Sequence, residues 1–167
     1  MKLNAYIQAI YLAASAGTQM LSVSTAKAMA GIGLEGDRYA LGTGAYSAIE
    51  PTKVRHISII AVSGINTAND WLTAGDEPTF DGPETRRNIV LAGIAASELN
   101  ALVGKPFQIG SIQLLGTELC TPCERPAQLL SRLSFMDAFE GRGGIRAEIL
   151  NSGALTVGDK LFIGNEG

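Results

Sequence analysis

The chain has 167 residues, enough for one folded domain, and we expect residues 1–167 to form a single one. A chain of this length buries on the order of 70% of the surface that it exposes when unfolded, so it needs neither disulfide bonds nor a structural metal to fold. Its 13 Lys and Arg against 16 Asp and Glu give a net charge of −3, which argues against a general nucleic-acid binder, and one histidine with two cysteines cannot complete a four-ligand Cys/His zinc site.

The first half of the sequence predicts two strands and one helix. Apolar residues alternate with polar ones at the start, which predicts a half-buried strand over residues 2–13. The small and polar residues 16–30 lead into residues 31–39, where three glycines argue against regular helix and favour an ordered loop or a bulge. The β-branched run 56–62 predicts a second strand, and residues 64–72 predict a short helix after it.

The second half predicts mostly short strands. The expected elements are a strand entered at 86–91, one or two helical turns at 97–102, a hairpin of 105–110 with 111–119, a helix within 124–140, and strands at 145–150 and 160–163 joined by a turn at 153–159. Many short strands, 20 glycines and a few short helices favour a mainly β fold, a β-barrel with short α-helices, over a βαβ array.

The apolar content and the N-terminal residues predict a cytoplasmic protein without a membrane partner. No apolar run reaches the ~18 residues of a membrane span. Asn4 and Gln8 interrupt the apolar stretch that a signal peptide would keep continuous. In a reducing compartment a pair of cysteines is more often catalytic or metal-binding than structural.

The motif Cys120-Thr121-Pro122-Cys123 is the first candidate for chemistry. Two cysteines three residues apart can share a metal, form a redox disulfide, or use one thiolate as ligand or nucleophile while the other resolves it. They can also be small buried residues at a strand end. Thioredoxin-like exchange is a further alternative, but that motif occupies the first strand-to-helix unit of an α/β sheet, whereas this one follows a hairpin.

Arginine is concentrated around this motif. Residues 86–146 contain seven basic and five acidic side chains, a charge of +2, which leaves −5 for the rest of the chain. Six of the seven are Arg, whose planar guanidinium matches a phosphate or a carboxylate. We therefore predict a modest-sized anionic ligand near the cysteines, while Arg132 and Arg125 can equally form a solvated helix face.

Two glycine-containing motifs complete the candidates. In residues 33–38, Gly-Leu-Glu-Gly-Asp-Arg, the acidic side chains can ligate a cation or cap amides of the loop itself. In residues 143–146, Gly-Gly-Ile-Arg, the paired glycines can let the backbone approach a ligand that Arg146 also contacts, or they can simply form a turn.

Taken in order, these motifs resemble a known family. The residues that carry the resemblance are GLEGDR at 33–38, TRRNIV at 85–90, LNALVG at 99–104, LCTPC at 119–123, GGIRA at 143–147 and GD at 158–159. They resemble the MOSC domain, which is the C-terminal domain of molybdenum-cofactor sulfurases and also occurs as stand-alone bacterial proteins. The resemblance covers roughly residues 30–165 and implies a β-barrel with short helices. One departure is Tyr39, which stands where many relatives have histidine.

The resemblance also implies binding of a molybdopterin-type molybdenum cofactor. It makes Cys123 the thiolate ligand of molybdenum or the carrier of a persulfide, with Cys120 in a secondary role. The cofactor-binding residues that it implies are Arg86, Arg87 and Asn88 at the pterin phosphate, Arg146 and Asn151, and Asp37 and Arg38 from the opposite loop. The cofactor's phosphate and dithiolene sulfurs suit arginine and a soft thiolate.

Three functions are consistent with this resemblance. The first is reduction of N-hydroxylated compounds at molybdenum, with electrons from a separate reductase, because the chain shows no motif for haem, flavin or an iron–sulfur cluster. The second is a sulfur carrier that accepts persulfide sulfur onto Cys123 from a pyridoxal-phosphate-dependent cysteine desulfurase. The third is a non-catalytic module that binds or transfers the cofactor.

Overall fold

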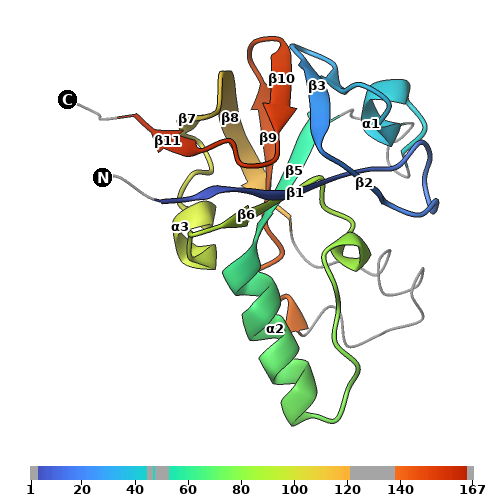
Figure 1. Ribbon diagram of the computed structural model, residues 1–167, viewed down its shortest axis with the longest axis vertical. Coiled ribbons are helices and arrows are strands. Elements are labelled where there is room, and N and C mark those ends of the chain that lie inside the picture. The colour runs from blue at the N-terminus through green and yellow to red at the C-terminus, as the bar shows by residue number, and fades with distance from the viewer. Residues whose placement is uncertain (1–3, 45–46, 48–52, 121–137, 165–167) are drawn as a thin grey trace.

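The computed structural model describes residues 4–44, 47, 53–120 and 138–164. These residues form two β-sheets and a few short helices, so the mainly β prediction is confirmed. The sheets pack together in the upper part of Figure 1, and helix α2 (Val62–Ala74) extends below them. No helix within the described ranges is long and apolar enough to cross a membrane.

The larger sheet has eight strands in the order β11-β7-β8-β9-β5-β6-β1-β2, and its neighbours are antiparallel except for the parallel pair β5 and β6. Its strands are β1 (Tyr6–Leu12), β2 (Leu21–Val23), β5 (Ile57–Ala61), β6 (Ile89–Ala92), β7 (Pro106–Ile109), β8 (Ile112–Leu119), β9 (Ile145–Ile149) and β11 (Leu161–Ile163). The smaller sheet, in the order β10-β3-β4, consists of β3 (Thr25–Met29), β4 (Gly33–Leu34) and β10 (Gly153–Thr156).

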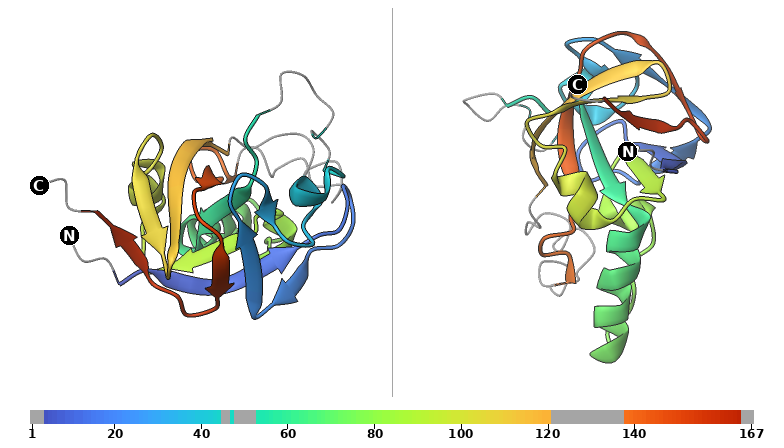
Figure 2. Two further views of the ribbon diagram at one scale, coloured as in Figure 1. Left: turned by 90° about the horizontal axis from the view of Figure 1, so that it is seen from above. Right: turned by 90° about the vertical axis from the view of Figure 1, so that its left-hand side faces the viewer.

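The larger sheet curls back on itself because β1 has two partners along one edge. The C-terminal half of β1 pairs with β2. Its N-terminal half bonds the chain that leads into β11: Ile7 N donates to Asp159 O at 2.9 Å, and Leu161 N donates to Ala5 O at 2.9 Å. The sheet is therefore barrel-like, as Figure 2 shows from above.

The core divides according to the face of the sheet on which each side chain lies. Alternate residues such as Ile59 and Leu91 are fully buried in the main apolar cluster inside the curled sheet. Their neighbours Ile60 and Val90 belong to a second cluster that also contains the buried residues of α2. A T-shaped pair of rings, Phe80 with Phe139, lies in this second cluster with centroids 5.6 Å apart.

The short helix α1 has a defined cap at each end. Helix α1 (Arg38–Leu41) begins after Asp37, whose extended backbone and side chain form the N-cap, and it ends at Gly42 with φ of 75°. The described residues also contain the short helix α3 (Ala96–Asn100) and the 3₁₀ turn η1 (Pro83–Thr85). The expectation of a loop without helix over 31–39 is corrected at both ends, since this stretch contains β4 and the start of α1.

Most predicted elements are present, and two further expectations are corrected. The expected turn at 153–159 contains β10, and the small, polar stretch 16–30 contains β2 and β3. β10 and β3 pair with each other across a long sequence separation that no local pattern reveals, whereas β2 pairs with the nearby β1. Most of the helix expected within 124–140 lies outside the described residues.

Candidate functional site

A buried carboxylate, that of Asp37, lies at the centre of the predicted site residues. Its Oδ1 atom accepts hydrogen bonds from the backbone N of Ala13 at 3.2 Å, from Nη1 of Arg38 at 3.1 Å and from Nδ2 of Asn88 at 3.2 Å. Its Oδ2 atom accepts from the Tyr39 backbone N at 3.5 Å. Of the two alternatives for this loop, the structure shows the capping of amides, and no cluster of three metal-ligating side chains occurs among the described residues.

Arg38 is a buried cation that is already neutralised. It pairs with Asp37, and its whole residue is 8% exposed. Its Nη2 atom donates to the backbone O of Arg86 at 3.2 Å, which ties α1 to the Arg-Arg-Asn segment. The ring of Tyr39 lies under the same guanidinium, 5.2 Å from its centre, and forms a cation–π contact.

All hydrogen-bonding positions of the Asn88 side-chain amide are occupied by groups of the protein. Its Nδ2 donates to Tyr11 O at 3.1 Å and to Asp37, and its Oδ1 accepts from both the backbone N and the hydroxyl of Ser58 at 3.1 Å. An amide has two hydrogens and two lone pairs to offer, and all four are used here. Asn88 therefore holds β1, β5 and the Asp37 loop in register.

Arg87 differs from Arg38 because it has no acidic partner among the described residues. It is 8% exposed, and its Nε and Nη1 atoms donate only to backbone carbonyls, Gly143 O at 2.8 Å and Thr85 O at 3.2 Å. In the part of the chain that the structure describes, Arg87 has no ion pair, and its Nη2 atom has no hydrogen-bond acceptor. Burying an unpaired ion costs several kcal/mol, so this guanidinium favours a bound anion.

The end of β8 lies beside Arg87. A Cβ placed on Gly143 would overlap the backbone O of Cys120 and lie 3.6 Å from Nη2 of Arg87, so all three groups meet at one point. The backbone N of Cys120 donates to Gly144 O at 2.8 Å. The paired glycines therefore let strand segments approach each other. Cys120 is buried with a free thiol, and Cys123 lies outside the described residues.

Arg86 and Arg146 lie near this centre with partners of their own. Arg86 adopts a left-handed conformation, with φ of 59°, and its Nη1 atom donates to Thr18 O at 2.7 Å. Arg146 on β9 pairs with Glu118, Nη1 to Oε1 at 3.1 Å, and Lys53 approaches the other oxygen of Glu118 at 3.4 Å.

Asn151 is not brought together with the other predicted residues. Its side chain bonds Gln113 N and Ser111 O, at the start of β8, whereas Cys120 follows the end of that strand. At ~3.3 Å per strand residue the two positions are roughly 25 Å apart. Its observed role is to hold the turn after β9 against the β7–β8 hairpin.

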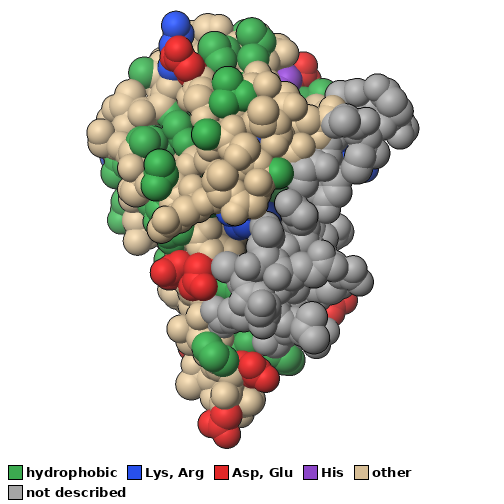
Figure 3. Space-filling model, turned by 90° about the vertical axis from the view of Figure 1, so that its right-hand side faces the viewer, with side chains coloured by type: hydrophobic (Ala, Val, Ile, Leu, Met, Phe, Trp, Pro, Cys, Tyr) green, Lys and Arg blue, Asp and Glu red, His purple; other side chains and the backbone are tan. Residues whose placement is uncertain are grey.

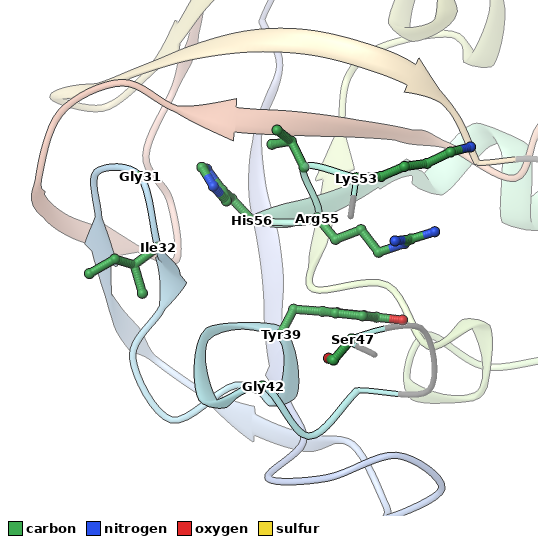
Figure 4. Close-up of a pocket in the computed structure, with 9 residues that line it drawn as sticks. Gly31, Ile32, Tyr39, Gly42, Ser47, Lys53, Arg55 and His56 are labelled. Atoms are coloured by element: carbon green, nitrogen blue, oxygen red, sulfur yellow. The ribbon is translucent and has the colours of Figure 1, made fainter. Parts of the chain in front are cut away.

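A pocket of about 310 Å³ lies next to this network and was not predicted from the sequence. Its walls, drawn in Figure 4, are formed by Gly31, Ile32, Tyr39, Gly42, Ser47, Lys53, Val54, Arg55 and His56. The signal that could have revealed it is the run Lys-Val-Arg-His at 53–56, three basic residues directly before a strand. Figure 3 shows Lys and Arg side chains at a few places along the border of the grey residues, and Asp and Glu side chains both at the top of the molecule and in its lower part.

His56 has a defined hydrogen-bonding state. Its Nδ1 atom accepts from the backbone N of Ile149 at 3.0 Å, so the ring is neutral there. Desolvation by burial lowers the pKa of His56 below its usual value, and the nearby carboxylate of Glu148 opposes part of this shift.

Comparison with known proteins places the chain in a family. Residues 47–162 match the model of the MOSC domain. The chain belongs to the MOSC domain family. This MOSC domain is similar to the crystal structure of the YuaD protein from Bacillus subtilis, with 19% identity, a TM-score of 0.76, and coverage of 94% of this chain and 93% of that one.

Two further solved structures resemble this MOSC domain. YiiM from Geobacillus stearothermophilus has 12% identity and a TM-score of 0.71, over 98% of this chain and 76% of that chain. YiiM from Escherichia coli has 14% identity and a TM-score of 0.65, over 100% of this chain and 71% of that chain. At such identities these likenesses establish the fold alone. No curated protein sequence matches this MOSC domain.

Proposed function

We propose that this MOSC domain binds a molybdopterin-type molybdenum cofactor at Arg87, with Cys123 as the thiolate ligand. The observation that carries the proposal is the buried guanidinium of Arg87, which has no acidic partner among the described residues. An anionic group of the cofactor supplies the missing charge, and the fork geometry of arginine suits a phosphate. Arg87 lies beside Cys120, the first residue of the Cys-x-x-Cys motif, which supports an anion site next to this motif.

The roles of the surrounding residues follow from their hydrogen bonds. Arg87 offers Nη2 to the anion. Asp37 and Asn88 are positioning residues, because their polar atoms are satisfied within the protein and hold the Arg-Arg-Asn segment in place. Arg146 is paired with Glu118, and we propose no direct cofactor contact for Asn151.

When bound, the cofactor supplies a molybdenum centre that takes up an oxygen atom and passes on two electrons. The activity that we propose is the reduction of an N-hydroxylated compound, R–NHOH, by two electrons and two protons to R–NH₂ and water. The N–O bond breaks, and the electron pair comes from a separate reductase. Support for this activity is membership of the MOSC family together with the anion site beside the cysteine motif.

The test is the molybdenum content of protein purified from a host that makes the cofactor. We expect wild type to contain molybdenum in near-stoichiometric amount and Cys123→Ser to lose it. Arg87→Gln should also lose it, whereas Arg87→Lys, which keeps the charge but loses the fork, should retain an intermediate amount. Lys105→Gln, at an exposed lysine where β7 begins, is the matched control and should bind as wild type does.

Circular dichroism of each variant shows whether the fold is intact. Wild-type protein without molybdenum, or a folded Arg87→Gln protein that keeps its full complement, would overturn the proposal. In the first case, a mass gain of one sulfur on Cys123 after exposure to a cysteine desulfurase would establish the sulfur-carrier alternative. Molybdenum binding without turnover of any N-hydroxylated compound would establish the cofactor-binding module.

A further inference from the structure

The pocket shown in Figure 4 ends close to the Cys-x-x-Cys motif. At that end the Lys53 ammonium lies 3.4 Å from Oε2 of Glu118 on β8, and Figure 4 shows it at the tip of this strand. Cys120 follows Glu118 by two residues, which is about 7 Å along an extended chain. Its backbone O would overlap a Cβ placed on Gly143, and the same Cβ would lie 3.6 Å from Nη2 of Arg87. One end of the pocket therefore lies beside the proposed cofactor site.

Two hydrogen-bond donors in the pocket wall have no acceptor among the described residues. The first is the hydroxyl of Tyr39, whose ring is held by its cation–π contact with Arg38. The second is Nε2 of His56, which carries the ring hydrogen because Nδ1 accepts from a backbone amide of β9. In Figure 4 the Tyr39 hydroxyl lies toward the Lys53 end, and the His56 ring extends toward Gly31 at the other end. The pocket therefore offers a neutral donor at each end.

These donors favour an uncharged ligand of modest size. Both cations among the described lining residues, Lys53 and Arg55, have interaction partners, and the partner of Lys53 is Glu118. A phenol and a neutral imidazole suit a neutral acceptor such as a carbonyl oxygen, and they do not compensate the charge of an ion that leaves water. Ile32 and Val54 add apolar surface to the wall. The volume of about 310 Å³ lies at the lower end of the range for ligand pockets, which suits a compound of one or two rings.

We propose that this pocket holds the organic part of the compound that is reduced at the cofactor, an inference that rests on the proposed function. The compound is an uncharged N-hydroxylated amide of an aromatic ring, R–CO–NHOH. Its carbonyl oxygen accepts from the Tyr39 hydroxyl, so that the N–O bond lies at the Lys53 end, toward the cysteine motif. The ring contacts Ile32 and Val54, and an acceptor on the far side of the ring accepts from Nε2 of His56.

The first test is calorimetric titration of the purified protein with isonicotinamide. This probe is a product of the type R–CO–NH₂ and has an acceptor at each end, the amide oxygen and the ring nitrogen. Benzamide lacks the ring nitrogen, and we expect it to bind about threefold to tenfold more weakly, the effect of one neutral hydrogen bond. Isonicotinate carries a carboxylate in place of the amide, and we expect it to bind at least about tenfold more weakly, because its charge is not compensated.

Two tyrosine variants locate the binding. Tyr39→Phe keeps the ring over Arg38 and removes only the hydroxyl, so it should bind isonicotinamide about threefold to tenfold more weakly than wild type. Tyr6→Phe, at an exposed tyrosine on β1, removes the same group outside the pocket and should bind as wild type does. Circular dichroism shows whether each variant is folded.

A competition experiment connects the pocket to the reaction. Molybdenum-containing protein is supplied with pyridine-4-carbohydroxamic acid and with a reduced viologen dye, which provides the two electrons, while the buffer provides the two protons. The N–O bond breaks, and the products are isonicotinamide and water. Isonicotinamide should inhibit competitively. Tyr39→Phe should raise KM about threefold to tenfold and leave kcat within about twofold, because the hydroxyl binds the carbonyl group equally in substrate and transition state.

The inference is overturned if isonicotinamide does not bind, if benzamide or isonicotinate binds as tightly, if Tyr39→Phe binds as Tyr6→Phe does, or if the inhibition is not competitive. Molybdenum content and titration separate the two proposals. Protein that contains molybdenum and does not bind isonicotinamide refutes this inference alone. Protein that binds isonicotinamide and contains no molybdenum refutes the proposed function, and with it the role of the pocket in the reduction.

Discussion

Replacing Asp37 by asparagine should destabilise the protein strongly, because the carboxylate neutralises a buried cation. The Arg38 side chain is 9% exposed and pairs with Asp37 at 3.1 Å, so Asp37→Asn leaves that guanidinium without its acid. Removing one partner of a buried ion pair costs about 3–5 kcal/mol. For a chain of this length, about 2–4 °C of melting temperature is lost per kcal/mol, which gives a decrease of about 6–20 °C.

The loss has a second component in hydrogen bonding. Oδ1 of Asp37 accepts from three donors, and Oδ2 faces the backbone N of Tyr39. An asparagine has only one oxygen, so whichever way its amide is turned, an NH₂ group points at a donor. Rotation of the side chain therefore cannot rescue the variant.

Urea unfolding at neutral pH, followed by circular dichroism and by fluorescence of the single Trp71, measures this effect. Asp70→Asn, at an exposed acid on α2, removes the same charge and should change the free energy of unfolding by less than about 0.5 kcal/mol. A loss below about 1 kcal/mol in Asp37→Asn would refute the reasoning. The double variant with Arg38→Met should recover part of the loss, since no unpaired cation then remains.

Two further predictions concern Gly144 and His56. Gly144→Ala should lower the free energy of unfolding by well over about 2 kcal/mol, because φ is +93° and the new Cβ would overlap the backbone O of Ile59. The control Gly158→Ala has φ of +98° but open space around it, and should lower the free energy of unfolding by about 1–2 kcal/mol. Equal melting temperatures of the two variants would contradict this prediction. Burial lowers the pKa of His56, so the unfolded state protonates first as the pH falls. The contribution of His56 to the free energy of unfolding should therefore be largest above the unfolded-state pKa of about 6.5 and decrease below it. Between about pH 8 and about pH 5.5 the urea midpoint of His56→Gln should fall less than the urea midpoint of wild type.

The strands that could be predicted are those whose burial pattern is local. In β1 the buried Ile7 and Ile10 stand among more exposed residues, and the apolar run of β5 is buried along almost its whole length. β10 offers no such pattern, because Leu155 is its one buried residue. It is held by pairing with β3, where the hydroxyls of Thr25 and Thr156 meet at 3.3 Å across 131 residues of sequence.

The motifs of the candidate site could be recognised from the sequence, but the partners of their side chains could not. The Arg-Arg-Asn segment and the glycine loop are both recognisable as sequence motifs, and the structure brings Asp37 and Asn88 into contact. Which of these side chains meets a ligand depends on partners that are far away in the sequence. The side-chain amide of Asn88 bonds Tyr11 and Ser58, two partners that lie 77 and 30 residues away from it in the sequence.

The described arginines of the site are alike in sequence and differ in what neutralises them. Arg38 is neutralised by an adjacent buried acid, and Arg146 shares Glu118 with Lys53 at a partly exposed position. Among the described residues, the hydrogen-bond acceptors of Arg87 are backbone carbonyls alone. Exposed charges are screened within about 8–10 Å at physiological salt, and buried ones much less. The exposed ion pair of Lys53 with Glu118 should therefore weaken as salt is added, while an anion held by the buried Arg87 should be retained. This difference in salt sensitivity follows from the burial and the pairing of each cation, which a count of basic residues does not reveal.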